Sequence, residues 1–244
     1  KSPVSIYIDG VYVPGQYFAV FDLANIQSIQ VLKGPQGTLF GRNATGGAIL
    51  VTTSRPSDTL TGQVNASYAR FNDLRLSGYV SGPIAENLNF DIAANYHKDH
   101  GYARDVVRKT RLAEYKDYSV RGKLEFAPDA DTSILLIADY GKIRDETPVS
   151  LKPMRAALSP AGAFVPTNPF EQASTFDPFA TSEGGGISLE VKHDFGGVSL
   201  KSLTAFRKTK AFSITDQDRV QAALSRIDQT IHDKYLTHEL TLSS

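Results

Sequence analysis

Apolar and polar residues alternate along the chain from residue 61 to residue 244, and this alternation constrains the fold more than any other feature. A period of two is the pattern of β-strands that present two different faces. Phe90 and Ile92, for example, flank Asp91. The pattern predicts a chain dominated by β-structure, with eight strands near residues 61–71, 74–84, 88–99, 117–127, 132–144, 185–195, 198–214 and 231–243.

The connections between these strands are alternately short and long. Three segments hold the Pro, Gly, Asp and Asn residues of tight turns: 83–87, 128–131 and 196–197. At the other end of the sheet, the first connection, 71–73, is short. The later connections there are longer polar stretches: 100–116, 145–184 and 215–230. All the tight turns therefore fall at one end of the sheet. This is the layout of an outer-membrane β-barrel, which has short periplasmic turns and long extracellular loops.

A soluble β-sandwich also alternates apolar and polar positions, because its apolar faces form the core. Three features favour the membrane. The strands have about 10 residues, which a tilted spanning strand needs. Ionised groups such as Glu125 and Glu190 on the polar face suit a wet lumen, and aromatic residues gather near strand ends, as in interfacial girdles. The chain has no tryptophan, however, and Tyr79 falls on the polar face, so the alternation alone leaves both folds open.

Composition excludes several other classes of protein. Lys and Arg number 26, as do Asp and Glu, so no net charge favours a nucleic acid partner. The absence of cysteine excludes disulfides and cysteine-ligated zinc. The longest strictly aliphatic run, 134–138, is far shorter than a spanning helix of about 20 residues. The first residues are already strand-like and lack a signal-peptide pattern, so we expect the natural N-terminus to be missing.

A glycine-rich stretch, KGPQGTLFGRNATGG at 33–47, precedes the alternating region. A phosphate-binding P-loop needs Lys and then Ser or Thr after its second glycine, but Arg42 and Asn43 follow Gly41 here. The glycine spacings also differ from those of a dinucleotide-binding turn, and residues 48–53 resemble a strand where that motif has a helix. The stretch is therefore not predicted to bind a nucleotide.

Together with YIDGVYV at 7–13, the same stretch resembles the plug domain of the TonB-dependent outer-membrane receptors. The plug pattern is a strand ending in a basic residue and Gly-Pro, a short turn with an aromatic residue and glycine, and Gly-Gly before another strand. The matching residues here are Lys33, Gly34, Pro35, Gly37, Phe40, Gly41, Arg42, Asn43, Gly46, Gly47 and Ile49. The segments 81–102 and 234–244 are similar to early barrel strands of that family. The glycines are then structural, since they allow positive φ and close packing in a crowded lumen.

This resemblance implies an all-β-dominated fold: a partial transmembrane antiparallel β-barrel, about eight of 22 strands, with part of a small α+β plug domain. Residues 1–56 are expected to be the C-terminal part of the plug, and residues 61–244 the N-terminal portion of the barrel. The boundary is placed near Arg55–Pro56 because Pro56 removes a backbone donor and biases Arg55 to an extended conformation.

The function that the resemblance implies is TonB-dependent active transport of a scarce ligand across the outer membrane. An iron–siderophore complex is the first choice of ligand, with cobalamin, other metal chelates and oligosaccharides left open. TonB would act through an N-terminal segment missing here, and outer-membrane lipid is the other expected partner. No enzymatic activity, cofactor or bound metal is expected. The alternative is a passive porin or a non-transporting adhesion barrel, although a porin would have no plug.

Three sets of residues are predicted to take part in this function. Tyr17 and Phe18 are candidate ligand contacts, or else they pack within the plug. Arg42 is expected to pair with a carboxylate of the barrel wall, or else to cap nearby plug carbonyls; the candidate carboxylates are Glu239, then Glu190 and Glu125. The segment 150–186 is expected to be a long mobile extracellular loop, with a hinge at Gly184–Gly186.

Overall fold

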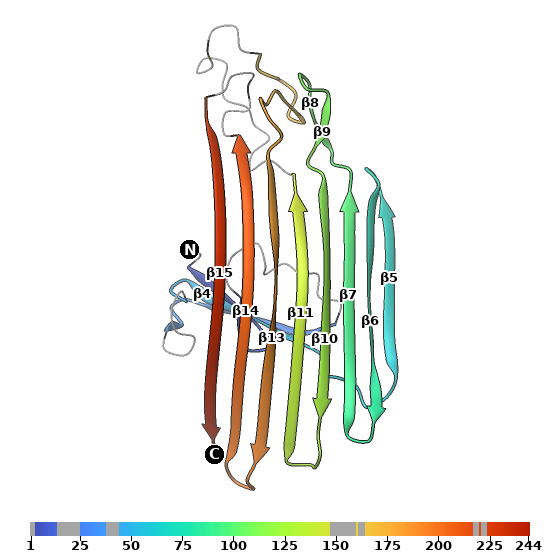
Figure 1. The fold of residues 1–244 in the computed structure, drawn as a ribbon, viewed down its shortest axis with the longest axis vertical. Helices are drawn as coiled ribbons and strands as arrows, with labels where there is room; N and C mark the ends of the chain where they lie inside the picture. Colours follow the sequence, from blue (N-terminus) through green and yellow to red (C-terminus); the bar gives the residue numbers. More distant parts are fainter. Residues whose placement is uncertain are drawn as a thin grey trace.

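The computed structural model describes residues 3–13, 25–37, 44–146, 160, 164–216, 220 and 224–244. The elements within these residues are strands in three sheets, which we call the wall, the plug sheet and the tip sheet (Figure 1). The predicted fold class, dominated by β-structure, is therefore confirmed. Among the described residues, no helix is long and apolar enough to cross a membrane.

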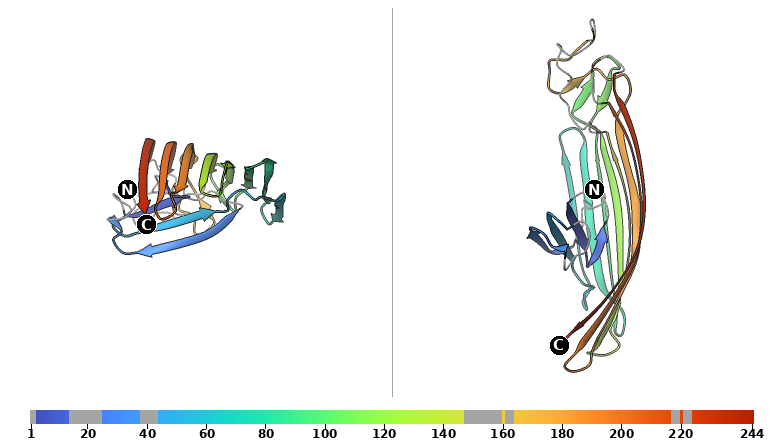
Figure 2. Two further views of the ribbon diagram at one scale, coloured as in Figure 1. Left: turned by 90° about the horizontal axis from the view of Figure 1, so that it is seen from below. Right: turned by 90° about the vertical axis from the view of Figure 1, so that its left-hand side faces the viewer.

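The wall is an antiparallel meander of eight strands, ordered β15-β14-β13-β11-β10-β7-β6-β5. Each strand pairs with the wall strand next to it in the chain, and the long sheet is curved (Figure 2). All eight predicted strands are present. They are β5 (Thr61–Ala69), β6 (Asp73–Ala85), β7 (Leu88–Asp99), β10 (Tyr115–Phe126), β11 (Thr132–Asp145), β13 (Phe179–Asp194), β14 (Ser199–Asp216) and β15 (Arg226–Ser243).

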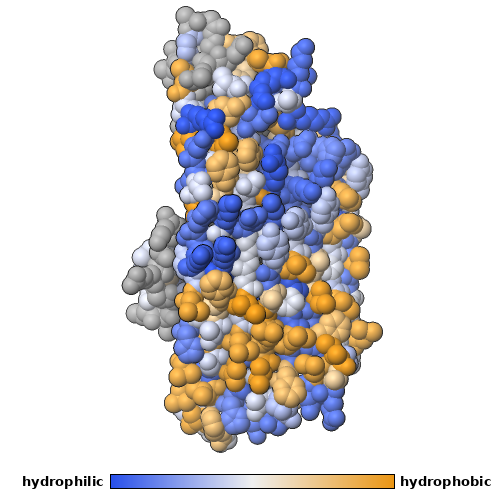
Figure 3. All heavy atoms as spheres, in the orientation of Figure 1, coloured by the Kyte–Doolittle hydropathy of each residue, from blue (hydrophilic) through white to orange (hydrophobic). Residues whose placement is uncertain are grey.

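The two faces of the wall differ as the alternation predicts. On β7, Asp91 faces the plug sheet and is 1% exposed, whereas its neighbour Ile92 points outward and is 49% exposed. On β10, Arg121 and Lys123 are buried on the plug side, and Val120 is exposed on the other. Figure 3 shows this outer face, with hydrophobic side chains gathered over its lower half. The polar face is thus the inner face, covered by the plug sheet.

The two ends of the wall have different connections, again as predicted. At the lower end the strands are joined by tight turns, in which Asn87 and Gly196 have positive φ angles of 61° and 83°. At the upper end β5 and β6 are joined by a short turn with positive φ at Phe71 and Asn72. The other upper connections are long.

The tip sheet forms within two of these long connections. It consists of β8 (Ala103–Asp105), β9 (Thr110–Leu112) and β12 (Glu171–Gln172), and β12 pairs in parallel with β8. Asp105 is fully buried and fixes both connections, because its carboxylate accepts hydrogen bonds from the backbone N–H groups of Val107, Arg108 and Ser174. The described end of the predicted loop 150–186 therefore contains paired strand residues.

The expected hinge at Gly184–Gly186 is wrong. These glycines lie inside β13, which begins at Phe179, and Gly186 pairs with Asp139 on one side and Arg207 on the other. A Cβ added to Gly186 would lie 2.7 Å from Cγ of Arg207. The glycine therefore makes room for the Arg207 side chain to cross the strand toward Asp139, a role that requires rigid pairing rather than flexibility.

The plug sheet lies on the concave side of the wall (Figure 2). Its order is β2-β1-β4-β3, in which β1 pairs in parallel with β4 and the other pairs are antiparallel. The strands are β1 (Val4–Ile8), β2 (Val11–Val13), β3 (Ile26–Lys33) and β4 (Gly47–Thr53). Strand β3 thus ends at the predicted basic residue, and β4 begins at the second glycine of the Gly-Gly pair.

Two glycines of the plug motif have the positive φ angles that the sequence predicts. The φ angle is 82° at Gly34 and 144° at Gly47. A Cβ on Gly47 would overlap the backbone oxygen of Leu32, and one on Gly46 would lie 3.3 Å from the Pro3 side chain. The glycines therefore allow both unusual backbone conformations and close packing in this part of the plug.

Candidate functional site

The turn between β1 and β2 carries a plug carboxylate to the wall. Asp9 and Gly10 have positive φ angles of 49° and 79°, the conformation that an Asp-Gly pair favours in a two-residue hairpin. The backbone of Gly10 lies against β14, where an added Cβ would be 3.0 Å from Cδ2 of Leu203. The hairpin tip therefore fits closely into the inner face of the wall.

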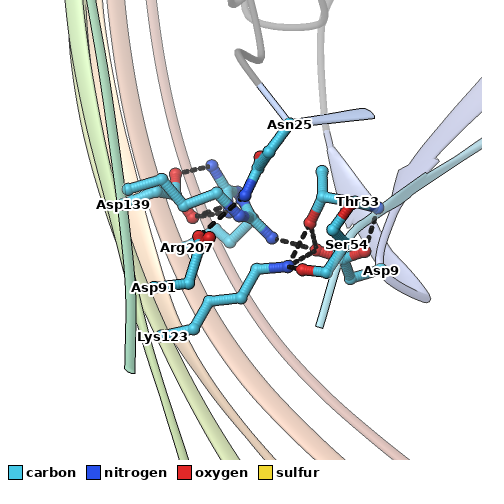
Figure 4. Close-up of polar contacts among 9 residues, drawn as sticks. Asp9, Asn25, Thr53, Ser54, Asp91, Lys123, Asp139 and Arg207 are labelled. Carbon is cyan, nitrogen blue, oxygen red and sulfur yellow. Dashed lines mark hydrogen bonds and ion pairs between the residues drawn. The ribbon is translucent and has the colours of Figure 1, made fainter. Parts of the chain in front are cut away.

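The Asp9 carboxylate joins the plug sheet to β10 of the wall (Figure 4). Within the plug it accepts hydrogen bonds from the backbone N–H and the hydroxyl of Thr53, at 2.8 and 2.7 Å. From the wall, Nη2 of Arg121 lies 2.5 Å from Oδ2, and Nζ of Lys123 lies 3.7 Å away. One carboxylate thus holds two plug strands together and pairs with two wall cations.

These contacts set the charge state of Asp9. Burial by itself would raise the pKa of this carboxyl, but the ammonium of Lys123, the guanidinium of Arg121 and the two hydrogen bonds from Thr53 together hold the pKa below its ordinary value. Asp9 is therefore ionised at neutral pH, and the ion pairs are fully formed.

Neighbouring wall residues fix the position of Arg121. Asp139 on β11 accepts a bidentate pair of hydrogen bonds from Arg207, at 2.7 and 2.8 Å, and a longer one of 3.4 Å from Arg121. A bidentate arginine–carboxylate pair is strong and directional. Asp139 therefore lies between two arginines, one of which extends to the plug.

A second set of contacts surrounds Lys123. Its ammonium donates to the Thr53 hydroxyl and to the backbone oxygen of Ser54, the latter at 2.5 Å. Nearby, the amide of Asn25 donates to the wall carboxylate of Asp91 at 2.7 Å (Figure 4). The wall thus holds both strands at one end of the β3–β4 pair, where Ile26 pairs with Thr53.

Arg55 forms a third contact, closer to solvent. Its guanidinium bonds to Glu125 and, at 2.5 Å, to Glu190. Glu190 also pairs with Lys192 and Lys201 at 3.0 and 3.2 Å. Because the Arg55 side chain is 40% exposed, water competes for these ion pairs, and each contributes less to stability than the Asp9 contacts.

The interface also contains apolar contacts and an internal space. Val11 of the plug packs with Leu203 and Ala205 of β14 in one buried cluster. Beside it, a cavity of about 440 Å³ lies between plug and wall, lined by residues that include Asp9, Thr53, Lys123, Glu190, Lys201 and Leu203. Such a polar cavity is large enough to hold several water molecules.

The structure describes some of the predicted site residues. Glu125 and Glu190 lie on the inner face and bond to Arg55, whereas Glu239 on β15 accepts a hydrogen bond from Thr241. Six residues of the predicted site and motif lie outside the described residues: Tyr17, Phe18, Phe40, Gly41, Arg42 and Asn43. The pairing of Arg42 with a wall carboxylate therefore stays a prediction.

The sequence reasoning missed Asp9 and Arg55 as interface residues. A signal for Asp9 was present, since Asp-Gly between two short apolar runs is typical of a hairpin tip. Its wall partners have no local signal, because they depend on how two separate sheets meet.

Comparisons with known proteins agree with this arrangement. Residues 1–48 match the family model described as TonB-dependent Receptor Plug Domain. The pesticin receptor of Yersinia pestis is 35% identical over 85 residues, 35% of this chain and 12% of that receptor. The ferripyoverdine receptor of Pseudomonas aeruginosa is 30% identical over 121 residues, 49% of this chain and 14% of that receptor. The chain thus spans a small part of the length of these curated relatives.

Solved structures share the fold across almost the whole chain. The open form of the ferric-catecholate import receptor Fiu from E. coli K12 aligns with a TM-score of 0.77 at 21% identity, covering 100% of this chain and 40% of that one. The pyoverdine outer-membrane receptor FpvA from Pseudomonas aeruginosa PAO1 aligns with a TM-score of 0.76 at 19% identity, covering 98% and 36%.

Proposed function

We propose that this chain, which is similar to the TonB-dependent receptors of the outer membrane, takes part in the active uptake of an iron–siderophore complex. In this proposal the plug sheet blocks the lumen at rest. TonB, which acts from the inner side, rearranges the plug and opens a path for the ligand.

The observation that carries this proposal is the docking of the plug sheet on the inner face of the wall through exchangeable polar contacts. Asp9, Arg121 and Lys123 form ion pairs beside a polar cavity. Water can replace such contacts when the plug moves, since charged groups are well solvated. A seam made only of apolar side chains would resist rehydration. A passive porin has no plug to hold, so this seam favours a transporter over the alternative.

The choice of an iron–siderophore complex rests on the relatives, which include receptors for ferripyoverdine and ferrioxamine. These relatives are receptors and not enzymes, and we propose no enzymatic activity. Tyr17 and Phe18 remain our candidate ligand contacts, because aromatic side chains bury a large area with few rotatable bonds.

We also propose that the plug ends near Arg55–Pro56 and that the barrel begins near Thr61. The last strand of the plug sheet ends at Thr53, and the first strand of the wall begins at Thr61. Arg55 lies in the connection between them and contacts the wall through its side chain.

Uptake of radioactive iron supplied as a single siderophore complex tests the proposed function. A strain that lacks its own copy of the receptor is complemented with the receptor that contains this chain. We expect saturable uptake that requires TonB and stops when the proton-motive force is collapsed. Uptake that is independent of TonB would support a passive pore instead. Uptake of cobalamin or an oligosaccharide without uptake of iron would support the proposed transport but contradict the proposed ligand.

A further inference from the structure

Basic side chains lie next to one another on the outer face of the wall. Lys98, Lys116 and Arg144 occupy adjacent strands and are direct cross-strand neighbours, Lys98 with Lys116 and Lys116 with Arg144. Lys208 and Lys234 form a second such pair on β14 and β15. Like charges directly opposite one another destabilise a sheet unless an anion lies between them. We call these residues, with Lys142 and Lys210, the outer basic belt.

On the inner face of the wall, by contrast, charged cross-strand neighbours are mostly of opposite sign. There, Arg121 is directly opposite Asp139, and Lys123 is directly opposite Asp91. The single like-charged pair that we find among the described inner residues is Lys192 with Lys201, and the carboxylate of Glu190 bonds to both ammonium groups. Where two lysines meet inside, the protein supplies the anion itself.

The outer belt has fewer such partners. Arg144 pairs with Glu146 at 2.6 Å, and Lys142 with Glu183 at 3.2 Å. Among the described residues, we find no ion pair to Lys98, Lys116, Lys208 or Lys234; the ammonium of Lys116 lies 5.9 Å from the ring centre of Tyr96. These four lysines therefore leave positive charge on the outer face that the described residues do not neutralise.

The belt has a definite place relative to the membrane. Tyr96 precedes Lys98 by two positions on β7, and Tyr118 follows Lys116 by two positions on β10. Both tyrosines are therefore on the same face as the lysines, closer to the lower end of the wall. Tyr118 contacts Tyr140 with ring centres 6.4 Å apart. Below these rings the outer face is apolar, with exposed residues such as Val120, Leu124, Ile187 and Leu189. The belt thus begins where an aromatic girdle ends, on the side of the long loops, which is the level of outer-leaflet headgroups.

We propose that the outer basic belt binds the phosphate groups of lipids with a net negative headgroup in the outer leaflet of the membrane. Each ammonium can donate up to three hydrogen bonds to phosphate oxygens, and a phosphate between Lys98 and Lys116 relieves their mutual repulsion in the way that Glu190 does inside. The acyl chains of the same lipid would cover the apolar surface below the tyrosines. This site is independent of the ligand that the lumen transports.

Binding of lipid to the purified receptor that contains this chain tests the inference. In detergent micelles the receptor is titrated with dioleoyl phosphatidylglycerol or dioleoyl phosphatidylcholine, and bound lipids are counted by native mass spectrometry. The variant Lys98→Gln with Lys116→Gln is expected to lose affinity for phosphatidylglycerol by about fivefold per lysine at low salt. The matched control is Lys109→Gln with Arg111→Gln, two exposed cations in the loop above the belt; it should bind like the unmodified receptor.

A second variant, Lys208→Gln with Lys234→Gln, keeps the test decisive if the first one does not fold. Equal binding of the two lipids, or unchanged affinity in the belt variants, would overturn the inference. Displacement of phosphatidylglycerol by equimolar glycerol 1-phosphate would assign the belt to a soluble anion. Belt variants that lose a co-purifying protein but bind as much lipid as before would assign the belt to a protein partner. Either result would also contradict the lipid assignment.

Discussion

Asp9, at the tip of a plug hairpin, and Arg121, on strand β10 of the wall, form a 2.5 Å ion pair between residues 112 positions apart in the sequence. Their side chains are only 11% and 7% exposed. In so enclosed a place, a charge that loses its partner is costly, because neither water nor another group can replace it without rearrangement. This pair is therefore the first place to perturb the docking of the plug.

Asp9→Asn is expected to weaken plug docking by about 3 kcal/mol, at the low end of the cost of breaking a buried ion pair. The low end applies because Arg121 keeps Asp139 as a partner, whereas Lys123 loses its nearest plug carboxylate. The free energy of plug unfolding, followed by protease sensitivity in urea, measures the effect. Asp58→Asn is the control, since Asp58 is exposed and should change stability by less than about 0.5 kcal/mol. Equal urea midpoints for the two variants would contradict the role of Asp9.

The same carboxylate predicts how docking depends on pH. The pKa of Asp9 is lower in the folded protein than in an unfolded chain, where the pKa of an Asp is about 3.9. Its contribution is therefore fully present above pH of about 4 and declines as the pH falls through the lower folded pKa. The difference in unfolding free energy between the unmodified protein and Asp9→Asn should stay constant from neutral pH to that point and then shrink. A difference that already shrinks between pH 7 and 5 would disagree with this assignment.

Arg55 and Glu190 should show an energetic coupling of about 1 kcal/mol or less in a double-mutant cycle, because the arginine is partly exposed. The substitutions are Arg55→Gln and Glu190→Gln, alone and together, with plug unfolding as the measurement. The same cycle on Arg42 and Glu239 tests the pair predicted from the sequence. If the effects of the two single substitutions on plug unfolding simply add up in the double variant, the two residues of that pair do not interact across the plug–wall interface.

Gly47→Ala is expected to destabilise the plug sheet by about 1–3 kcal/mol. The φ angle of 144° is unfavourable for alanine, and the added methyl group would overlap the backbone oxygen of Leu32 in the adjacent strand. Gly37→Ala is the matched control, since a Cβ there meets no heavy atom within 4 Å. Thermal unfolding of the plug measures both variants, and a similar midpoint for Gly47→Ala and Gly37→Ala would refute the steric argument.

A covalent link between Val11 and Leu203 should stop uptake of ligand without preventing its binding. The two side chains pack together across the plug–wall interface, and the chain has no cysteine of its own, so Val11→Cys with Leu203→Cys can be joined by a short thiol crosslinker. Iron uptake should fall when the link forms and recover when a cleavable crosslinker is cut. Each single-cysteine variant, treated in the same way, is the control. Full uptake in the linked receptor would show that this part of the plug does not need to leave the wall.

Much of the fold could be predicted because its determinants are local. Each wall strand reveals its two faces through residues next to one another, such as Asp91 and Ile92, and each tight turn through its own Gly, Pro, Asp or Asn residues. The structural role of Gly34 and Gly47 was likewise predictable, since a positive φ angle is a property of one residue and its close neighbours.

The interface was less predictable because its partners are distant in sequence. Nothing near Asp9 indicates that Arg121 is its partner, and nothing near Glu190 indicates that Arg55 is its partner. The tip sheet was missed for the same reason, since β12 has two residues and pairs with a strand in another loop. Gly184–Gly186 were misread because a run of glycines in a loop-like context suggests flexibility, whereas the need for space comes from Arg207 on the next strand.

The parallel pairing of β1 with β4 has a mechanical consequence. Five register pairs, from Val4 with Gly47 to Ile8 with Val51, join the two strands, and the anchored carboxylate of Asp9 follows directly after the last of them. A pull on the chain ahead of Val4, directed along β1, would therefore stress all five pairs in shear at once, with the wall holding the far end. Strands loaded in shear break together at high force, whereas strands pulled apart sideways open one bond at a time. The direction of the applied force, as much as its size, would then decide whether the plug unravels from β1 or shifts as one body.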